Sequence, residues 1–97
     1  MQITGRAGAQ GQGPFMVLHL ECEDGQVTAC SFETYGCPSA IRCGDWVARW
    51  AVGRALSSLR VLGAEDLLLV VGGLPLGKEF CAQMTVDALS EAVAQAP

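Results

Sequence analysis

The stretch DGQVTACSFETYGCPSAI, residues 24–41, contains the turn, the strand and the helix start that decide the fold. Its Asp24-Gly25 pair supplies the left-handed backbone conformations that a tight hairpin turn requires. Residues 27–35 are rich in β-branched and aromatic side chains, which predicts the return strand of that hairpin. After Gly36 the pattern becomes helical, and Pro38 suits a first helical turn because its missing N–H would have no partner there. The sequence therefore predicts a hairpin that leads directly into a helix.

Outward from this stretch, apolar and polar residues alternate over residues 15–22, which predicts the first strand of the hairpin. Downstream, helical patterns predict a helix that closes at Gly53, shorter helices at 54–62 and 64–71, and a last helix from about Phe80 to Gln95. Residues 1–14 are glycine-rich and polar, so we expect a flexible N-terminal arm. Residues 15–97 are then expected to form one α+β domain.

Composition excludes several classes of protein. The chain has 97 residues, 51% of them hydrophobic, so it can form a compact core and wholesale disorder is excluded. Six Lys and Arg against ten Asp and Glu give a net charge of −4, which argues against nucleic-acid binding. The longest uncharged runs are shorter than the roughly 18 residues of a membrane helix. The first residues resemble no targeting signal, so we expect a cytoplasmic protein.

Five cysteines, at positions 22, 30, 37, 43 and 81, are a high and odd number for a chain of this length. An odd number without a secretory signal favours reduced thiols over a disulfide framework. The spacing contains no CxxC pair and the chain has one histidine, so no zinc finger or ribbon can be read from it. Any metal site must therefore assemble ligands from distant segments.

The same stretch also carries a family resemblance. Residues 24–41, the helix that holds Trp50 and Gly53, and the later LPLGKEFC at residues 74–81 resemble the iron–sulfur scaffold family of IscU and the NifU N-terminal domain. The similarity covers about residues 12–95. It implies a small antiparallel sheet, three-stranded or similar, covered on one face by helices, with a metal site at one tip. It also implies a non-enzymatic scaffold or carrier with a cysteine desulfurase and cluster acceptors as partners.

The resemblance implies two metal ligands in this chain. Cys37 matches the family cysteine at the strand-to-helix turn, and Cys81 matches the one at the start of the last helix. Gly36, which forms the turn, and Lys78, three residues before the last cysteine, are the supporting residues. Both thiols are expected at helix N-termini, where free N–H groups favour the thiolate.

Other ligand positions of the family are lost. Gln12-Gly13-Pro14 stands where the family has Cys-Gly-Asp, and Phe80 replaces the histidine before the last cysteine. A [2Fe–2S] cluster or a zinc ion needs about four donors, so we expect weak or absent binding of either, or of iron, by a monomer. A symmetric homodimer that shares one cluster, with two thiolates from each subunit, would restore four ligands.

Several alternatives remain open from the sequence. Cys37 and Cys81 could be small buried residues left from an ancestral site, and the chain could then be a metal-free module that binds a protein such as a cysteine desulfurase. They could also form a redox dithiol, although no CxxC pair supports one. Cys43 and Asp45 are weak site candidates, because their Cys-Gly-Asp string lies on a predicted helix instead of a loop.

The remaining conspicuous side chains have simpler interpretations. Cys22 and Cys30 are expected to fill the core more readily than to bind metal. Trp46 and Trp50 lie on one flank of the predicted helix, which requires either a second layer of the domain or a partner surface to cover it.

Overall fold

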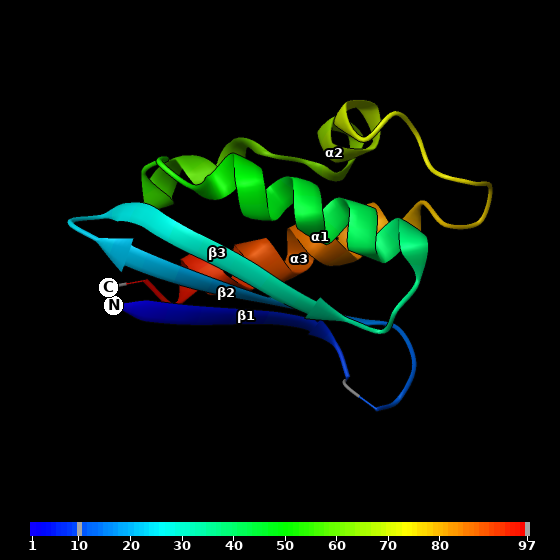
Figure 1. The fold of residues 1–97 in the computed structure, drawn as a ribbon, viewed down its shortest axis with the longest axis horizontal. Coiled ribbons are helices and arrows are strands. Elements are labelled where there is room, and N and C mark those ends of the chain that lie inside the picture. Colours follow the sequence, from blue (N-terminus) through cyan, green and yellow to red (C-terminus); the bar gives the residue numbers. More distant parts are fainter. Residues whose placement is uncertain (10, 97) are drawn as a thin grey trace.

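The computed structural model, which describes residues 1–9 and 11–96, is a three-stranded antiparallel sheet followed by helices. The strands β1 (Gln2–Gly8), β2 (Phe15–Glu23) and β3 (Gln26–Thr34) lie in the order β1-β2-β3. The helical elements are α1 (Pro38–Ala51), the 3₁₀ helix η1 (Leu56–Val61), α2 (Ala64–Val70) and α3 (Phe80–Ala94). In Figure 1, α1 lies along β3 and α3 runs across β1 and β2. The α+β fold class is confirmed.

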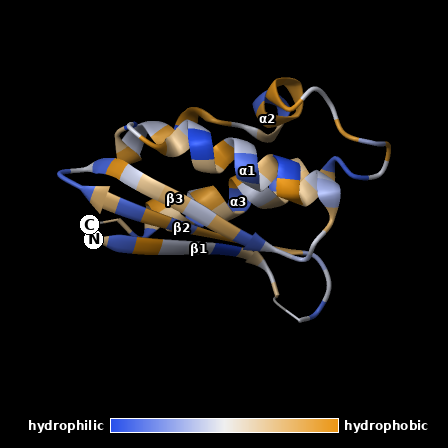
Figure 2. Cartoon of the chain, viewed as in Figure 1, coloured by the Kyte–Doolittle hydropathy of each residue, from blue (hydrophilic) through white to orange (hydrophobic). Residues whose placement is uncertain are grey.

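The hairpin of β2 and β3 forms as the sequence predicts. Asp24 and Gly25 have positive φ values of 53° and 78°, the conformation of a tight turn with a matching strand twist. Alternate residues of β2 face the helices, and Met16, Leu18 and Leu20 are fully buried. Figure 2 shows the alternation of apolar and polar residues along these strands. The hairpin therefore supplies the sheet side of the core.

The prediction of a flexible arm is wrong for residues 2–8, which form strand β1 and pair antiparallel with β2 from Gln2↔Glu21 to Gly8↔Phe15. This segment forms an ordered strand because Gly5 packs closely against α3. A Cβ atom at this position would lie 2.0 Å from the carbonyl oxygen of Ala88, so only glycine lets the backbone of α3 approach the strand. Gly5 therefore serves close packing on α3 and does not mark a flexible segment. Gln10, which the predicted arm also included, lies outside the described residues.

The helices complete the core from the other side. Helix α1 starts at Pro38 as predicted, and its Gly44 lies against the ring of Phe32 on β3. The two short helices are confirmed in place, although the first is a 3₁₀ helix that begins at Leu56. The inner face of α3 is buried as predicted, through Cys81, Thr85, Ala88, Leu89 and Ala92. Among the described residues, no helix has the length and apolarity to span a membrane.

Two connections meet at one end of the molecule, which we call the tip and define by residues 35–37 and 78–81. It lies opposite the two chain termini in Figure 1. Here β3 leads into α1, and the loop after α2 leads into α3. Arg42 of α1 holds that loop, because its guanidinium donates to the carbonyl oxygens of Val71 and Gly73, each at 3.3 Å. The tip brings together residues more than 40 positions apart in the sequence.

Candidate functional site

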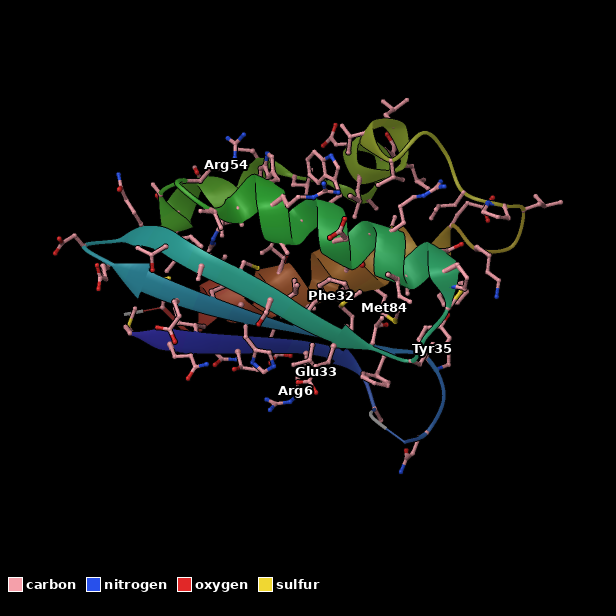
Figure 3. All side chains as sticks on the ribbon, viewed as in Figure 1. Arg6, Phe32, Glu33, Tyr35, Arg54 and Met84 are labelled. Carbon is pink, nitrogen blue, oxygen red and sulfur yellow. The ribbon has the colours of Figure 1, made fainter. Side chains whose placement is uncertain are left out.

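At the tip, the hydroxyl of Tyr35 joins the two cysteines that the family resemblance selects. Its Oη lies 3.7 Å from Sγ of Cys81, and the hydroxyl also lies near Cys37, since it lowers the pKa of that thiol. Figure 3 places Tyr35 at the end of β3, where the chain turns into α1. Cys81 is fully buried in the first turn of α3, whereas Cys37 is partly exposed. The structure thus gathers one accessible thiol, one buried thiol and one phenol.

Cys37 is the activated thiol of this group. The hydrogen bond from Tyr35 is the largest cause that lowers the pKa of Cys37 to about 7, from an ordinary value of 9.0. The backbone N–H groups of Ala40 and Ser39, at the start of α1, also lower this pKa, as does the charge of Lys78. These donors stabilise the thiolate, which is the nucleophilic and metal-binding form of cysteine. A large fraction of Cys37 is therefore ionised near neutral pH.

Cys81 differs from Cys37 because it is buried. Loss of solvent raises the pKa of its thiol, against the opposing influence of the Tyr35 hydrogen bond. The nearby Cys37 sulfur raises this pKa further, and Lys78 lowers it. Burial and the same two sulfurs raise the pKa of the Tyr35 phenol. Without a bound metal, Cys37 is therefore the first of these three groups to ionise as pH rises, while the Cys81 thiol and the Tyr35 phenol keep their protons at neutral pH.

The two supporting residues lie where the resemblance implies. Gly36 has a φ of 89°, a left-handed conformation that turns the chain from β3 into α1 and sets the position of Cys37. Lys78 precedes α3, and its charge acts on both Cys37 and Cys81. Its backbone is fixed on both sides, since its N–H donates to Pro75 and its carbonyl accepts from Cys81. The positive charge of Lys78 therefore lowers the pKa of both thiols.

The weak candidates do not converge with each other. Cys43 is fully buried against α3, where burial, followed by the nearby Cys81 sulfur, raises its pKa to about 11. Asp45 is exposed on the outer face of α1 and pairs with Arg49. The Cys-Gly-Asp string at residues 43–45 therefore directs its two polar side chains to different environments.

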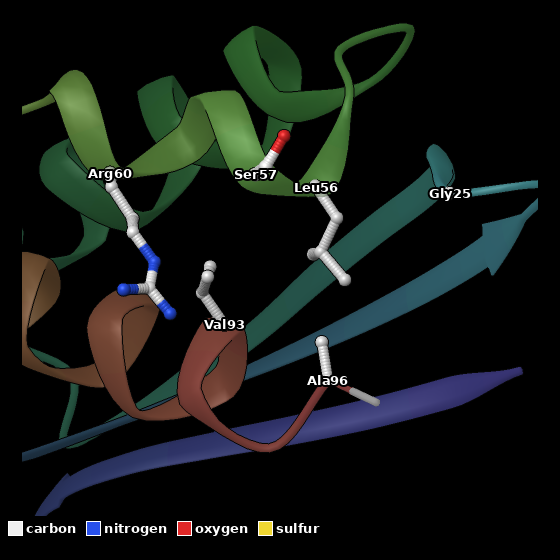
Figure 4. Close-up of a pocket in the computed structure, with 6 residues that line it drawn as sticks. All are labelled: Gly25, Leu56, Ser57, Arg60, Val93 and Ala96. Atoms are coloured by element: carbon white, nitrogen blue, oxygen red, sulfur yellow. The ribbon is translucent and has the colours of Figure 1, made fainter.

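The remaining candidates lie apart from the tip sulfurs. Trp46 and Trp50 stack with ring centroids 5.7 Å apart, and the Arg54 guanidinium lies 4.5 Å above the Trp50 ring. A depression of about 540 Å³ lies at the opposite end of the molecule, where Arg60 extends toward Val93 (Figure 4). None of the residues that line it is a cysteine. Neither feature contributes to the chemistry at the tip.

The lost family positions offer no replacement ligands. Gln12 and Pro14 are exposed in the connection between β1 and β2, and Phe80 is 42% exposed at the start of α3. Within residues 1–9 and 11–96, no three His, Cys, Asp or Glu side chains converge as metal ligands. The described part of the tip therefore offers two cysteine thiols, Cys37 and Cys81. The sequence reasoning overlooked Tyr35, although its position directly before Gly36-Cys37 could have suggested it.

Comparison with known proteins agrees with this architecture. The model of the family described as "NifU-like N terminal domain" matches residues 1–97. Iron-sulfur cluster assembly scaffold protein IscU of Escherichia coli is 32% identical over 92 residues, which cover 94% of this chain and 71% of the relative. Nitrogen fixation protein NifU of a Nostoc species is 30% identical over 92 residues, covering 93% of this chain and 31% of the relative.

Two further relatives match the same share of this chain at a lower identity. Iron-sulfur cluster assembly scaffold proteins IscU 1 and IscU 2 of Archaeoglobus fulgidus are each 26% identical over 90 residues, 93% of this chain. The chain spans 59% of the length of these two proteins. The match to the family model thus includes the β2–β3 hairpin, the Gly36-Cys37 turn and Cys81. This chain belongs to the NifU-like N-terminal-domain family, which includes the IscU scaffold proteins.

Proposed function

We propose that this protein is an iron–sulfur cluster assembly scaffold or carrier, with Cys37 and Cys81 as the residues that hold its cargo. The cargo is iron, zinc or a [2Fe–2S] cluster. The observation that carries the proposal is the convergence of these two thiols on Tyr35, with Lys78 close to both. Family membership supports it, because relatives across nearly the whole chain are named as cluster assembly scaffolds.

The two thiols would act in different ways. Cys37 is partly exposed and has a pKa of about 7, so it can meet incoming metal as a thiolate at neutral pH. Cys81 is buried and would release its proton when the metal binds, since the metal ligand is the thiolate. Lys78 offsets part of the negative charge that two thiolates bring to the tip. In these roles the two thiols bind and release a cargo, as in a carrier, and they catalyse no chemical reaction.

A homodimer would complete the ligand set of a cluster. One chain supplies two thiolates, and a [2Fe–2S] cluster takes four, so two tips facing each other would hold one cluster. The partners we propose are a cysteine desulfurase as sulfur donor and acceptor proteins for the finished cluster. Five free thiols suit a reducing compartment, and we propose the cytoplasm.

A second function has one observation in its favour. Apolar side chains flank the tip, with Leu76 97% exposed, Ile41 43% exposed and Phe80 42% exposed. Exposed apolar side chains around a site suit contact with another protein. A metal-free module that recognises a partner such as a cysteine desulfurase would use the same surface without cargo.

Metal analysis separates the two functions. The reduced chain is purified without oxygen and assayed for iron, zinc and acid-labile sulfide, alongside Cys37→Ser and the control Cys30→Ser, whose thiol lies on β3 away from the tip. A scaffold retains metal in the unchanged chain and in Cys30→Ser, and loses it in Cys37→Ser. Equal metal content in all three variants would contradict the proposal, and absence of metal after reconstitution would favour the metal-free module.

A further inference from the structure

We propose that Tyr35 is the third metal donor of the tip, with its phenolate oxygen bound to the same ion as the sulfurs of Cys37 and Cys81. This inference rests on the proposed function, because it names a further ligand of the same site. The set of two sulfurs and one oxygen would leave the fourth position of a tetrahedral ion to water or to a second protein.

The geometry is close to that of a bound ion. Zinc lies about 2.3 Å from sulfur and about 2.0–2.2 Å from oxygen, so neighbouring sulfur and oxygen ligands of a tetrahedral site are about 3.5–3.7 Å apart. The hydroxyl oxygen of Tyr35 lies 3.7 Å from the Cys81 sulfur. The Tyr35 hydroxyl also lies near Cys37, since it is the largest cause that lowers the pKa of that thiol. A zinc ion bound by this oxygen and the Cys81 sulfur would therefore need the separation that these two atoms already have.

The surroundings hold the phenol in this position. The ring of Tyr35 packs against Phe15 of β2, with centroids 6.4 Å apart and planes inclined by 50°. This contact involves only the ring, so it leaves the hydroxyl group available to bind a metal ion together with the sulfur atoms. Lys78, whose charge reaches both thiols, would balance an additional anionic oxygen. The described residues bring no third His, Cys, Asp or Glu to the two thiols.

The proposed arrangement also suits a carrier. Structural zinc sites are closed by four protein ligands, whereas sites with three protein ligands keep an open position. On binding, the phenolic O–H bond breaks, a metal–oxygen bond forms, and the proton passes to solvent without oxidation or reduction. An open fourth position would let a thiolate of a second protein enter while the cargo is still held, as transfer requires.

Zinc alone is a suitable probe, because Tyr35 is the only tyrosine of the chain. The reduced protein is titrated with zinc at neutral pH, where a free phenol is protonated, and ultraviolet difference absorption measures tyrosinate. Proton release per bound zinc is measured in parallel. We expect one tyrosinate per zinc in the unchanged chain. Tyr35→Phe, which keeps the ring against Phe15, should lose this absorption, release fewer protons and bind zinc about tenfold or more weakly.

Cobalt titration separates this inference from the proposed function, because thiolate-to-cobalt charge-transfer absorption detects the sulfurs independently of the phenol. Cys43→Ser, which removes the buried neighbouring thiol, should behave as the unchanged chain. Thiolate absorption without tyrosinate, with equal affinity in Tyr35→Phe, would overturn the role of Tyr35 and leave the two-thiol scaffold standing. Absence of both thiolate and tyrosinate absorption would overturn both.

Discussion

Replacement of Tyr35 by Phe should return the Cys37 thiol toward the behaviour of an ordinary cysteine. The phenol is the largest cause of the low pKa of about 7 at Cys37, and the ordinary value is 9.0. At pH 7 the thiolate fraction is then about one half in the folded chain and about 1% in a free thiol, a ratio of about 50. A thiolate of lower pKa is less nucleophilic, so at pH 7 we expect Cys37 to be alkylated only roughly five to eight times faster than an ordinary cysteine.

Alkylation by iodoacetamide across a series of pH values, with each cysteine followed by mass spectrometry, measures this directly. The Cys37 rate should rise with a midpoint near pH 7 in the unchanged chain, because the group gains its charge as pH increases through its pKa. In Tyr35→Phe the midpoint should move upward toward 9.0. Cys43, buried and with a pKa of about 11, is the internal control that should remain unreactive. An unchanged Cys37 midpoint in Tyr35→Phe would refute the reasoning.

Three further variants test the fold and the site. Gly5→Ala places a Cβ 2.0 Å from the carbonyl oxygen of Ala88, so chemical denaturation should show a loss of about 3 kcal/mol or more, and a loss below about 1 kcal/mol would show that α3 can shift freely. Gly36→Val has open space around it but a φ of 89°, so the free energy of unfolding should fall by roughly 1–3 kcal/mol; an unchanged melting temperature would contradict this. Gln12→Cys together with Phe80→His restores two family ligands and should strengthen zinc binding in competition with a chelator, whereas unchanged affinity would mean that these positions do not reach the metal.

Much of the fold could be predicted from local patterns. The Asp24-Gly25 turn, the alternation along β2 and Pro38 at the start of α1 each encode a local conformation, and the structure has all three. Strand β1 could not be predicted in the same way, because its glycines suggest flexibility to a local analysis. The role of Gly5 depends on Ala88, 83 residues later, and this contact exists only in the folded chain.

The candidate site, like the fold, could be predicted from local motifs only in part. Cys37 and Cys81 followed from motifs that the chain shares with its family, and Gly36 from the turn that a strand-to-helix connection needs. Tyr35 was interpreted only as the end of a strand, since no local pattern states which residue a side chain will contact 46 positions away. Cys43 was only a weak site candidate from the sequence, and in the structure it is buried beside Cys81 and Thr85 of α3.

The number of sulfur atoms around the bound metal tests the central claim most directly. X-ray absorption at the zinc edge of the zinc-loaded monomer should show two sulfur neighbours at about 2.3 Å, with lighter atoms completing the shell. Cys43→Ser should leave this number at two, and Cys81→Ser should reduce it to one. Three or four sulfurs in the monomer, or none, would contradict a site built on Cys37 and Cys81.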